Sequence, residues 1–245
     1  MREHRSIRLV ITEAIVLAGG FGTRLRAVVK DVPKPMAPVR GRPFLEYLLD
    51  YLASQGLRKV VLSVGYLSET IEAAFGRAYK TLSLDYVHEH QPLGTGGGIR
   101  LALEQTQGDS VLALNGDSYF PVPLAQFCRH HEDRQAQVTL ALKWMEHSDR
   151  YGTLQLEKDG SILAFMEKGA VAAGPINGGV YAIRRSVLGE FEAGRAFSFE
   201  RDVLEKHAGS LRMVGFLVDK YFIDIGIPED YARAQIELPD TAGAS

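Results

Sequence analysis

The chain has little cysteine, little net charge and no long apolar run. Its 245 residues include a single cysteine, Cys128, so no internal disulfide can form and the composition suits the reducing cytoplasm. Lys and Arg total 28 against 30 Asp and Glu, which gives no overall field for binding nucleic acid or an anionic membrane. No apolar run reaches the length of about 18 residues that a membrane-spanning helix needs. We therefore expect a soluble protein that binds neither nucleic acid nor membranes.

We also expect no signal peptide, and the sequence shows no linkers or repeats. Thr12 and Glu13 interrupt the basic, apolar start, and no small-residue cleavage site follows. No Ser/Gly linker, repeat or low-complexity segment divides the chain. We expect one domain over residues 1–245, with two functional halves at about 13–115 and about 116–236 and a loose tail at 237–245.

The hydrophobic pattern differs between these halves. The first half alternates buried strands with helices: strands at Ala14–Leu17, Val60–Val64, Leu82–Val87 and Val111–Leu114, helices at Pro43–Gln55 and around Ile99–Leu103. The second half has strands separated by short turns: Val138–Trp144, Gly152–Leu156, Ile162–Glu167 and Gly178–Ile183. The pattern predicts an α/β fold with a mostly parallel, mixed central sheet and a smaller antiparallel portion.

A glycine-rich turn follows the first predicted strand. Gly19, Gly20 and Gly22 let backbone N–H groups approach phosphate oxygens. The turn lacks the third glycine of a dinucleotide-binding loop and the Gly-Lys-Ser/Thr of a P-loop. Arg24 can clamp two phosphate oxygens with its planar guanidinium, and Lys34 adds a second cation from a proline-stiffened segment. The alternative is an ordinary glycine turn beside a surface Arg and Lys.

Two aspartates stand where predicted strands end. Asp117 follows the apolar strand that ends near Leu114, and Asp224 follows a second aromatic and apolar stretch. Mg²⁺ prefers a few carboxylates together with phosphate or water oxygens, so these two acids and a polyphosphate would form a sensible metal site. Taken singly, each acid could equally be a turn or helix-cap aspartate.

Polar residues also lie at strand ends in the second half. Tyr151 and Gly152, Glu167 and Lys168, and Asn177 could converge on a hydroxyl-rich ligand. From the residues alone, ordinary hairpin ends are the preferred interpretation.

Several motifs together resemble one known family. GGFGTRL followed by PKPM, PLGTGGGIR, NGD and DIGIPEDY is similar to the sugar nucleotidyltransferases over about Glu13 to Ile236. The resemblance is closest to the D-glycero-α-D-manno-heptose 1-phosphate guanylyltransferases, a branch that DRYGT and FSFE favour over the mannose 1-phosphate enzymes. The resemblance implies a Rossmann-like three-layer sandwich. It also implies an enzyme that couples a nucleoside triphosphate to a sugar 1-phosphate and releases pyrophosphate. Members of the family often form dimers or larger assemblies.

The resemblance implies roles for individual residues. Arg24 and Lys34 would assist the chemistry, and Asp117 and Asp224 would bind Mg²⁺. The nucleotide would contact Leu17, Ala18, Gly19, Gly20, Gly22, Thr23, Glu89, Gly94, Thr95 and Asn115. The sugar phosphate would contact Tyr151, Gly152, Glu167, Lys168 and Asn177. The first half would thus bind the nucleotide and the second half the sugar phosphate.

Glu89, five residues before Gly94, indicates the nucleotide base. An ionised carboxylate can accept hydrogen bonds from both N1–H and the N2 amino group of guanine, which predicts GTP. The alternative is a solvent-facing strand glutamate, with Gln91 reaching the base instead. The rival functions are mannose 1-phosphate guanylyltransferase, a uridylyl-, thymidylyl- or cytidylyltransferase acting on glucose 1-phosphate, and a non-catalytic nucleotide-sensing subunit.

Overall fold

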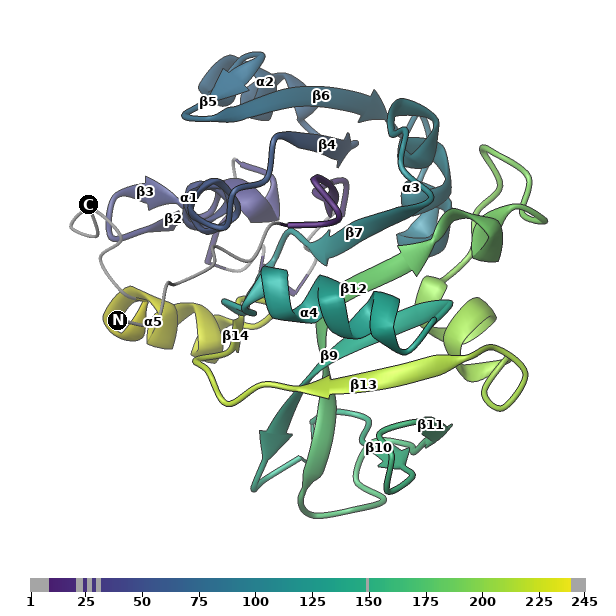
Figure 1. Ribbon diagram of the computed structural model, residues 1–245. Helices are drawn as coiled ribbons and strands as arrows, with labels where there is room; N and C mark the ends of the chain where they lie inside the picture. The colour runs from purple at the N-terminus through teal and green to yellow at the C-terminus, as the bar shows by residue number, and fades with distance from the viewer. Residues whose placement is uncertain (1–8, 21–23, 26–27, 30–31, 149, 239–245) are drawn as a thin grey trace, which may run out of the picture.

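A twisted eight-stranded sheet forms the centre of the molecule (Figure 1). The computed structural model describes residues 9–20, 24–25, 28–29, 32–148 and 150–238. The strand order is β13-β9-β12-β7-β1-β4-β6-β5. The strands are β1 (Glu13–Leu17), β4 (Lys59–Val64), β5 (Ala78–Tyr79), β6 (Leu82–His88), β7 (Ser110–Asn115), β9 (Val138–Met145), β12 (Gly174–Arg184) and β13 (Met213–Leu217). Neighbours run parallel except where β12 pairs with β7 and β9, and where β5 pairs with β6.

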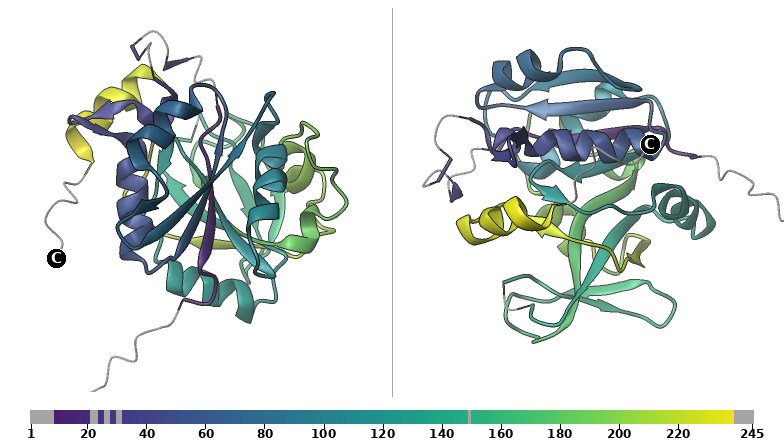
Figure 2. Two further views of the ribbon diagram at one scale, coloured as in Figure 1. Left: turned by 90° about the horizontal axis from the view of Figure 1, so that it is seen from above. Right: turned by 90° about the vertical axis from the view of Figure 1, so that its left-hand side faces the viewer.

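Helices cover both faces of this sheet (Figure 2). One face carries α1 (Phe44–Ser54), α2 (Ser68–Phe75), α4 (Leu124–Asp133) and α5 (Pro228–Glu237). The other carries α3 (Gly94–Ala102), the 3₁₀ turns η3 (Leu103–Gln105) and η4 (Arg185–Leu188), and the π-helical η5 (Phe199–Glu205). The predicted three-layer α/β sandwich is confirmed.

The two apolar cores explain why the central strands β1, β4 and β7 are largely hydrophobic. In β1, Ala14 and Val16 pack into the core under α1, whereas Ile15 packs into the core under α3. Successive side chains of a strand point to opposite faces, so a strand covered on both faces needs apolar residues at every position. The helix α1 is also buried on more than one side, because Tyr47 and Tyr51 are buried together with its leucines.

Strands of the second half join the same sheet. The predicted strands β9 and β12 extend the central sheet, because β12 inserts antiparallel between β7 and β9. The separate antiparallel portion is the hairpin of β10 (Leu154–Leu156) and β11 (Ile162–Phe165), which lies beyond this end of the sheet (Figure 1). The strands β9 and β12 therefore belong to the same sheet as the first half, and the β10–β11 hairpin stands outside it.

Several short elements position the site described below. They are the 3₁₀ turn η2 (Lys34–Met36) and the two-residue strands β2 (Pro38–Val39), β3 (Arg42–Pro43), β8 (Ser118–Tyr119) and β14 (Ile223–Asp224). At the other end of the chain, α5 includes Glu237 and is followed by the buried Leu238, while residues 239–245 of the predicted tail lie outside the described part. Within the described ranges, no helix combines the length and the apolar character needed to cross a membrane.

Candidate active site

A pocket of about 270 Å³ opens at the carboxyl ends of the parallel strands. Leu17 ends β1, Asn115 ends β7 and Glu89 directly follows β6, so three strands deliver side chains to one edge of the sheet. The pocket is lined by Leu17, Gly19, Gly20, Lys34, Pro35, Glu89, Pro92, Gly94, Thr95, Asn115 and Asp117. It therefore gathers most of the residues that the sequence assigned to the nucleotide.

Some predicted nucleotide contacts are not part of this lining. Gly22 and Thr23 lie outside the described residues. Arg24, which was predicted to assist the chemistry, is described and exposed, and it does not line the pocket either. Ala18 is buried, and its N–H donates to the carbonyl of Ser63 at 2.8 Å, which ties the end of β1 to β4. Ala18 thus supports the turn from behind.

Asp117 and Asp224 are brought together by a miniature sheet. Strands β8 and β14 pair antiparallel, with Asp224 opposite Ser118, and the N–H of Ile225 donates to the carbonyl of Asp117 at 3.0 Å. The ammonium of Lys34 bonds to the Asp117 carboxylate, and it lies 3.5 Å from Oδ1 of Asp224. Two acids more than 100 positions apart thus share one lysine at the pocket.

This acid pair carries surplus negative charge. Burial and the neighbouring charge of Asp117 raise the pKa of Asp224, and Lys34 and the N–H of Gly226, 2.7 Å from Oδ1, only partly oppose the rise. One ammonium faces two carboxylates, so a hard divalent cation would be favoured beside them. Within the described ranges, no group of three or more His, Cys, Asp and Glu forms a fuller ligand set. The donors fit a cation such as Mg²⁺ that takes its other ligands from phosphate and water.

The carboxylate of Glu89 is held in a fixed position in the pocket. Ser63 Oγ donates to its Oε1 at 2.8 Å, and the N–H of Leu93 donates to Oε2 at 3.1 Å. Two glycines make room for it: a Cβ added to Gly19 would lie 2.6 Å from Oε1, and one added to Gly98 would lie 3.0 Å away. Each carboxylate oxygen keeps a second lone pair for a ligand.

Gln91, the alternative base contact, lies elsewhere. It is exposed and lines a neighbouring hollow of about 230 Å³ together with Tyr66 and His90. Glu89 borders both spaces, but Gln91 does not line the pocket that holds Lys34 and Asp117. The geometry therefore favours Glu89 over Gln91 as the group nearest to a ligand in that pocket.

Asn115 presents an acceptor that the described residues leave unsatisfied. Its Oδ1 is buried and has no hydrogen-bond partner in the described part of the chain. Its amide packs against Gly179, where φ is +71° and an added Cβ would lie 2.8 Å from Nδ2. A buried acceptor is costly to leave unpaired, so a ligand or water is the natural partner for it.

The predicted sugar-phosphate residues are distributed over three places. Tyr151 lines a second pocket of about 280 Å³, which Asp224 also borders. Asn177 lies on β12, where its Nδ2 donates to the Tyr181 hydroxyl at 2.8 Å. Glu167 and Lys168 are exposed at the end of the β10–β11 hairpin, outside both pockets. Gly152 also lies at that end of the hairpin, and an added Cβ there would approach the Met166 carbonyl to 3.0 Å.

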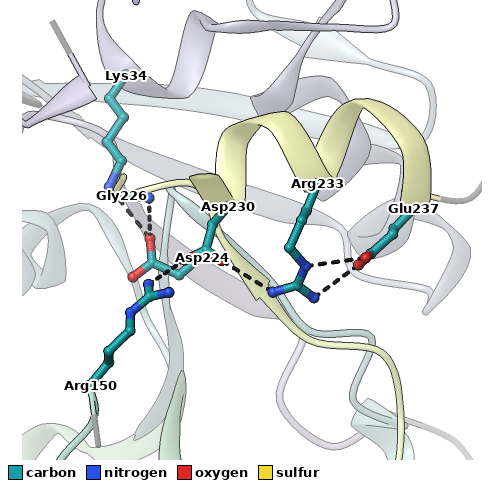
Figure 3. A network of polar contacts seen from close by, with 7 residues as sticks. All are labelled: Lys34, Arg150, Asp224, Gly226, Asp230, Arg233 and Glu237. Carbon is teal, nitrogen blue, oxygen red and sulfur yellow. Dashed lines mark hydrogen bonds and ion pairs between the residues drawn. The ribbon is translucent and has the colours of Figure 1, made fainter. Parts of the chain in front are cut away.

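The sequence reasoning missed an ionic network on the second pocket. Asp230, at the start of α5 and only 3% exposed, bonds to Arg150 and accepts from Arg233 at 3.1 Å. Figure 3 shows Lys34 and Arg150 reaching this region from opposite sides, with Arg233 clamped between Asp230 and Glu237. The network therefore holds Arg150 against α5. In the sequence, the acids of the PEDY motif and the arginine of DRYG could have predicted this network.

The fold is an open α/β sheet with its main pocket at the strand ends, the place where such sheets bind ligands. The chain belongs to the nucleotidyl transferase family, whose model matches residues 13–241.

Individual relatives are similar over nearly their full length. The chain is 47% identical to the D-glycero-alpha-D-manno-heptose 1-phosphate guanylyltransferase of Aneurinibacillus thermoaerophilus, covering 92% of this chain and 98% of that relative. It is 39% identical to the enzyme of the same name from Campylobacter jejuni, covering 89% of this chain and 96% of that relative. The crystal structure of HddC from Yersinia pseudotuberculosis complexed with GMP-PN superposes with a TM-score of 0.81 at 33% identity, over 92% and 98%.

Proposed function

We propose that this chain transfers the guanylyl group of GTP to D-glycero-α-D-manno-heptose 1-phosphate and releases pyrophosphate. The main support is that one pocket holds both the fixed carboxylate of Glu89 and the charged groups of Lys34 and Asp117. The names of the two bacterial relatives and the guanine nucleotide in the HddC structure support the same substrates.

Guanine recognition follows from the chemistry of Glu89. Guanine presents two adjacent donors, N1–H and the N2 amino group, and an ionised carboxylate can accept from both. Ser63 and Leu93 hold the carboxylate from behind, so it needs little reordering when a base arrives. Uracil, cytosine and adenine offer no such adjacent pair of donors.

The transfer step needs positioning and charge stabilisation rather than a general base. The phosphate dianion of the sugar attacks the α-phosphorus in line, and the bond from the α-phosphorus to the β-phosphate bridging oxygen breaks. We expect Lys34 and Arg24 to stabilise the charge on the phosphates, and the backbone at Gly19 and Gly20 to hold the chain of phosphates. Bound Mg²⁺, held by Asp117 and Asp224, would supply further charge neutralisation.

The sugar phosphate would occupy the side of the second half. We propose contacts with Tyr151, Gly152 and Asn177, and further contacts with Glu167 and Lys168. The last two are exposed at the end of the β10–β11 hairpin, so we expect this hairpin to move towards the ligand when it binds.

We also propose that the reaction takes place in the cytoplasm. Burial raises the pKa of the Cys128 thiol to about 12, so the lone cysteine is an unreactive part of the core. A chain without disulfides is at no disadvantage in a reducing compartment.

Substitution of the acid pair tests this proposal. Asp117→Asn and Asp224→Asn should each raise the Mg²⁺ concentration for half-maximal pyrophosphate release by at least about tenfold, because neutral amides bind a hard dication poorly. Asp219→Asn is the matched control, since that acid is fully exposed and, within the described part of the chain, bonds only to Lys143. Wild-type activity that survives EDTA would rule out the metal part of the proposal.

A further inference from the structure

Glu200, an acid outside the predicted site, accepts hydrogen bonds from three hydroxyl groups. Thr95 Oγ1 donates to Oε2 at 2.5 Å, Ser198 Oγ donates to the same oxygen at 3.1 Å, and the Tyr181 hydroxyl donates to Oε1 at 3.2 Å. Thr95 lines the main pocket, whereas Tyr181 lies on β12. Glu200 belongs to the FSFE motif, to which the sequence reasoning assigned no role.

The network continues from Tyr181 to Asn177. Asn177 Nδ2 donates to the Tyr181 hydroxyl oxygen at 2.8 Å, and Asn177 Oδ1 accepts from the N–H of Gly179 at 3.0 Å. An unbroken series of hydrogen bonds therefore joins Thr95, on the nucleotide side, to Asn177, on the sugar side. The residues come from three separate elements, α3, η5 and β12.

The direction of each bond in this series is determined. Thr95 Oγ1 accepts from the N–H of Phe199 at 2.9 Å, so its own proton is directed to Glu200. The Tyr181 oxygen accepts from Asn177, so its proton also points to Glu200. Burial, reinforced by the charge of Glu200, raises the pKa of Tyr181 well above its usual value, which keeps this hydroxyl a donor. A carboxylate is the one side chain that can accept at both ends.

We propose that Glu200 is a positioning residue that orients one polar group on each side of the reaction: Thr95 for the nucleotide and, through Tyr181, Asn177 for the sugar. This inference rests on the proposed function of the pocket. Glu200 itself is engaged by three protein hydroxyls, so it acts through its neighbours rather than by touching a substrate.

An amide at position 200 could not replace the acid. Glutamine has one acceptor and one donor end. If its NH₂ faced Tyr181, that hydroxyl would have to accept there, and the Asn177 amide would have to turn and lose the N–H of Gly179. If its NH₂ faced Thr95, the Thr95 hydroxyl would lose its acceptor. Either orientation disturbs a substrate side while preserving shape and volume.

The backbone around Glu200 is also fastened by hydrogen bonds that lie outside this network. The N–H of Phe197 donates to the Leu93 carbonyl at 2.9 Å, and the Phe197 carbonyl accepts from the N–H of Gly96 at 3.0 Å. These bonds fasten the segment before η5 to the start of α3 without any side chain of the network. We therefore expect Glu200→Gln to fold.

Steady-state kinetics with three variants test the inference. Glu200→Gln should raise KM by about fivefold or more for at least one of GTP and the sugar 1-phosphate, the effect of one misdirected hydrogen bond. Tyr181→Phe cuts the series beyond Glu200, so it should raise KM for the sugar 1-phosphate alone. Glu205→Gln makes the same chemical change at an exposed position of η5 and should leave both KM values within about twofold.

The outcomes separate this inference from the proposed function. A parent chain that uses neither GTP nor heptose 1-phosphate refutes the proposed function, and the same variants are then measured with the pair of substrates that it does use. An active parent with Glu200→Gln indistinguishable from Glu205→Gln overturns the inference alone. A Tyr181→Phe variant that changes KM for the nucleotide as much as for the sugar 1-phosphate also overturns it. Thermal unfolding of each variant checks that it folds, and Tyr181→Phe keeps the test open if Glu200→Gln does not.

Discussion

Single residues that no motif contains hold the pocket in shape. Ser63 is fully buried near the carboxyl end of β4, where the sequence pattern indicates only an apolar strand. Its hydroxyl nevertheless donates to Glu89, and its carbonyl accepts from Ala18, so it connects the acid in the pocket to the glycine-rich turn. A hydroxyl in a buried strand needs a partner, and Glu89 provides one.

Ser63→Ala should therefore weaken recognition of guanine. Without its oxygen, Glu89 loses one of the two donors that fix it, and we expect KM for GTP to rise about fivefold, equivalent to roughly 1 kcal/mol, with KM for the sugar 1-phosphate unchanged. Ser110→Ala is the control, because that hydroxyl faces His131 on the far side of the sheet. Equal GTP kinetics in the two variants would show that Ser63 does not position Glu89.

His131 provides a pH-dependent contribution to stability. It is fully buried, with Nδ1 2.8 Å from Thr139 Oγ1 and Nε2 3.3 Å from Ser110 Oγ. Burial, with the charges of Arg184 and His130, lowers its pKa to about 4. The unfolded chain takes up a proton at this histidine below about pH 6.5, and the folded chain does so only near pH 4, so stability falls as the pH drops between these values.

Urea unfolding at pH 7 and pH 5 measures this contribution. The wild-type chain should lose about 2 kcal/mol more unfolding free energy over this interval than His131→Gln, which cannot titrate. The difference between the two proteins isolates His131 from other titrating groups. Parallel losses in both proteins would mean that the imidazole is already protonated in the folded chain at pH 5.

At the scale of elements, the sequence predicted best the strands and helices with a clear pattern of apolar residues. The strands β1, β4 and β7 lie within one residue of the prediction because buried parallel strands are largely apolar. The prediction for β6 is as close, although that strand alternates apolar residues with Ser83 and Asp85. The beginning of α3 was missed, since Gly94 to Gly98 have poor helix propensity. Close packing explains why glycines stand there, because a Cβ on Gly96 would lie 2.2 Å from the Phe197 ring. The short strands β8 and β14 carry no pattern of their own, so the contact between Asp117 and Asp224 could not be derived from periodicity.

Gly94 at the start of α3 tests this explanation. Its φ is +69°, and an added Cβ would lie 2.6 Å from the Phe197 carbonyl oxygen. Gly94→Ala should therefore cost unfolding free energy through backbone strain, about 1–2 kcal/mol, together with displacement of the Phe197 segment, and it should raise KM for GTP. Gly209→Ala isolates the strain, because φ there is +84° and no described atom lies within 4 Å of the new Cβ. Equal destabilisation by the two substitutions would contradict a close contact between α3 and Phe197.

At the scale of the whole molecule, the layers followed from the sequence but the order of the strands did not. Insertion of β12 between β7 and β9 brings Tyr181 beside the strand that ends at Asn115, and it pairs Asn177 with Leu142 of β9. Local pattern contains no information about which strands pair across such distances, so the connection from Thr95 through Glu200 to Asn177 emerged only from the folded chain. The sequence alone placed three charged residues correctly in one pocket: Lys34, Asp117 and Glu89. Each lies in a motif in which proline or glycine accompanies the charged residue.

The most direct test is the substrate preference of the purified wild-type chain. Pyrophosphate release is measured with GTP, ATP, UTP, CTP and dTTP, each against heptose, mannose and glucose 1-phosphates, in Mg²⁺ and in EDTA. We predict that GTP with D-glycero-α-D-manno-heptose 1-phosphate gives the highest kcat/KM and that EDTA abolishes turnover. The proposed reasons are that Glu89 would pair with the adjacent donors of guanine and that the acid pair would require a dication. A chain that prefers a pyrimidine triphosphate, or that releases no pyrophosphate with any pair, would contradict the account.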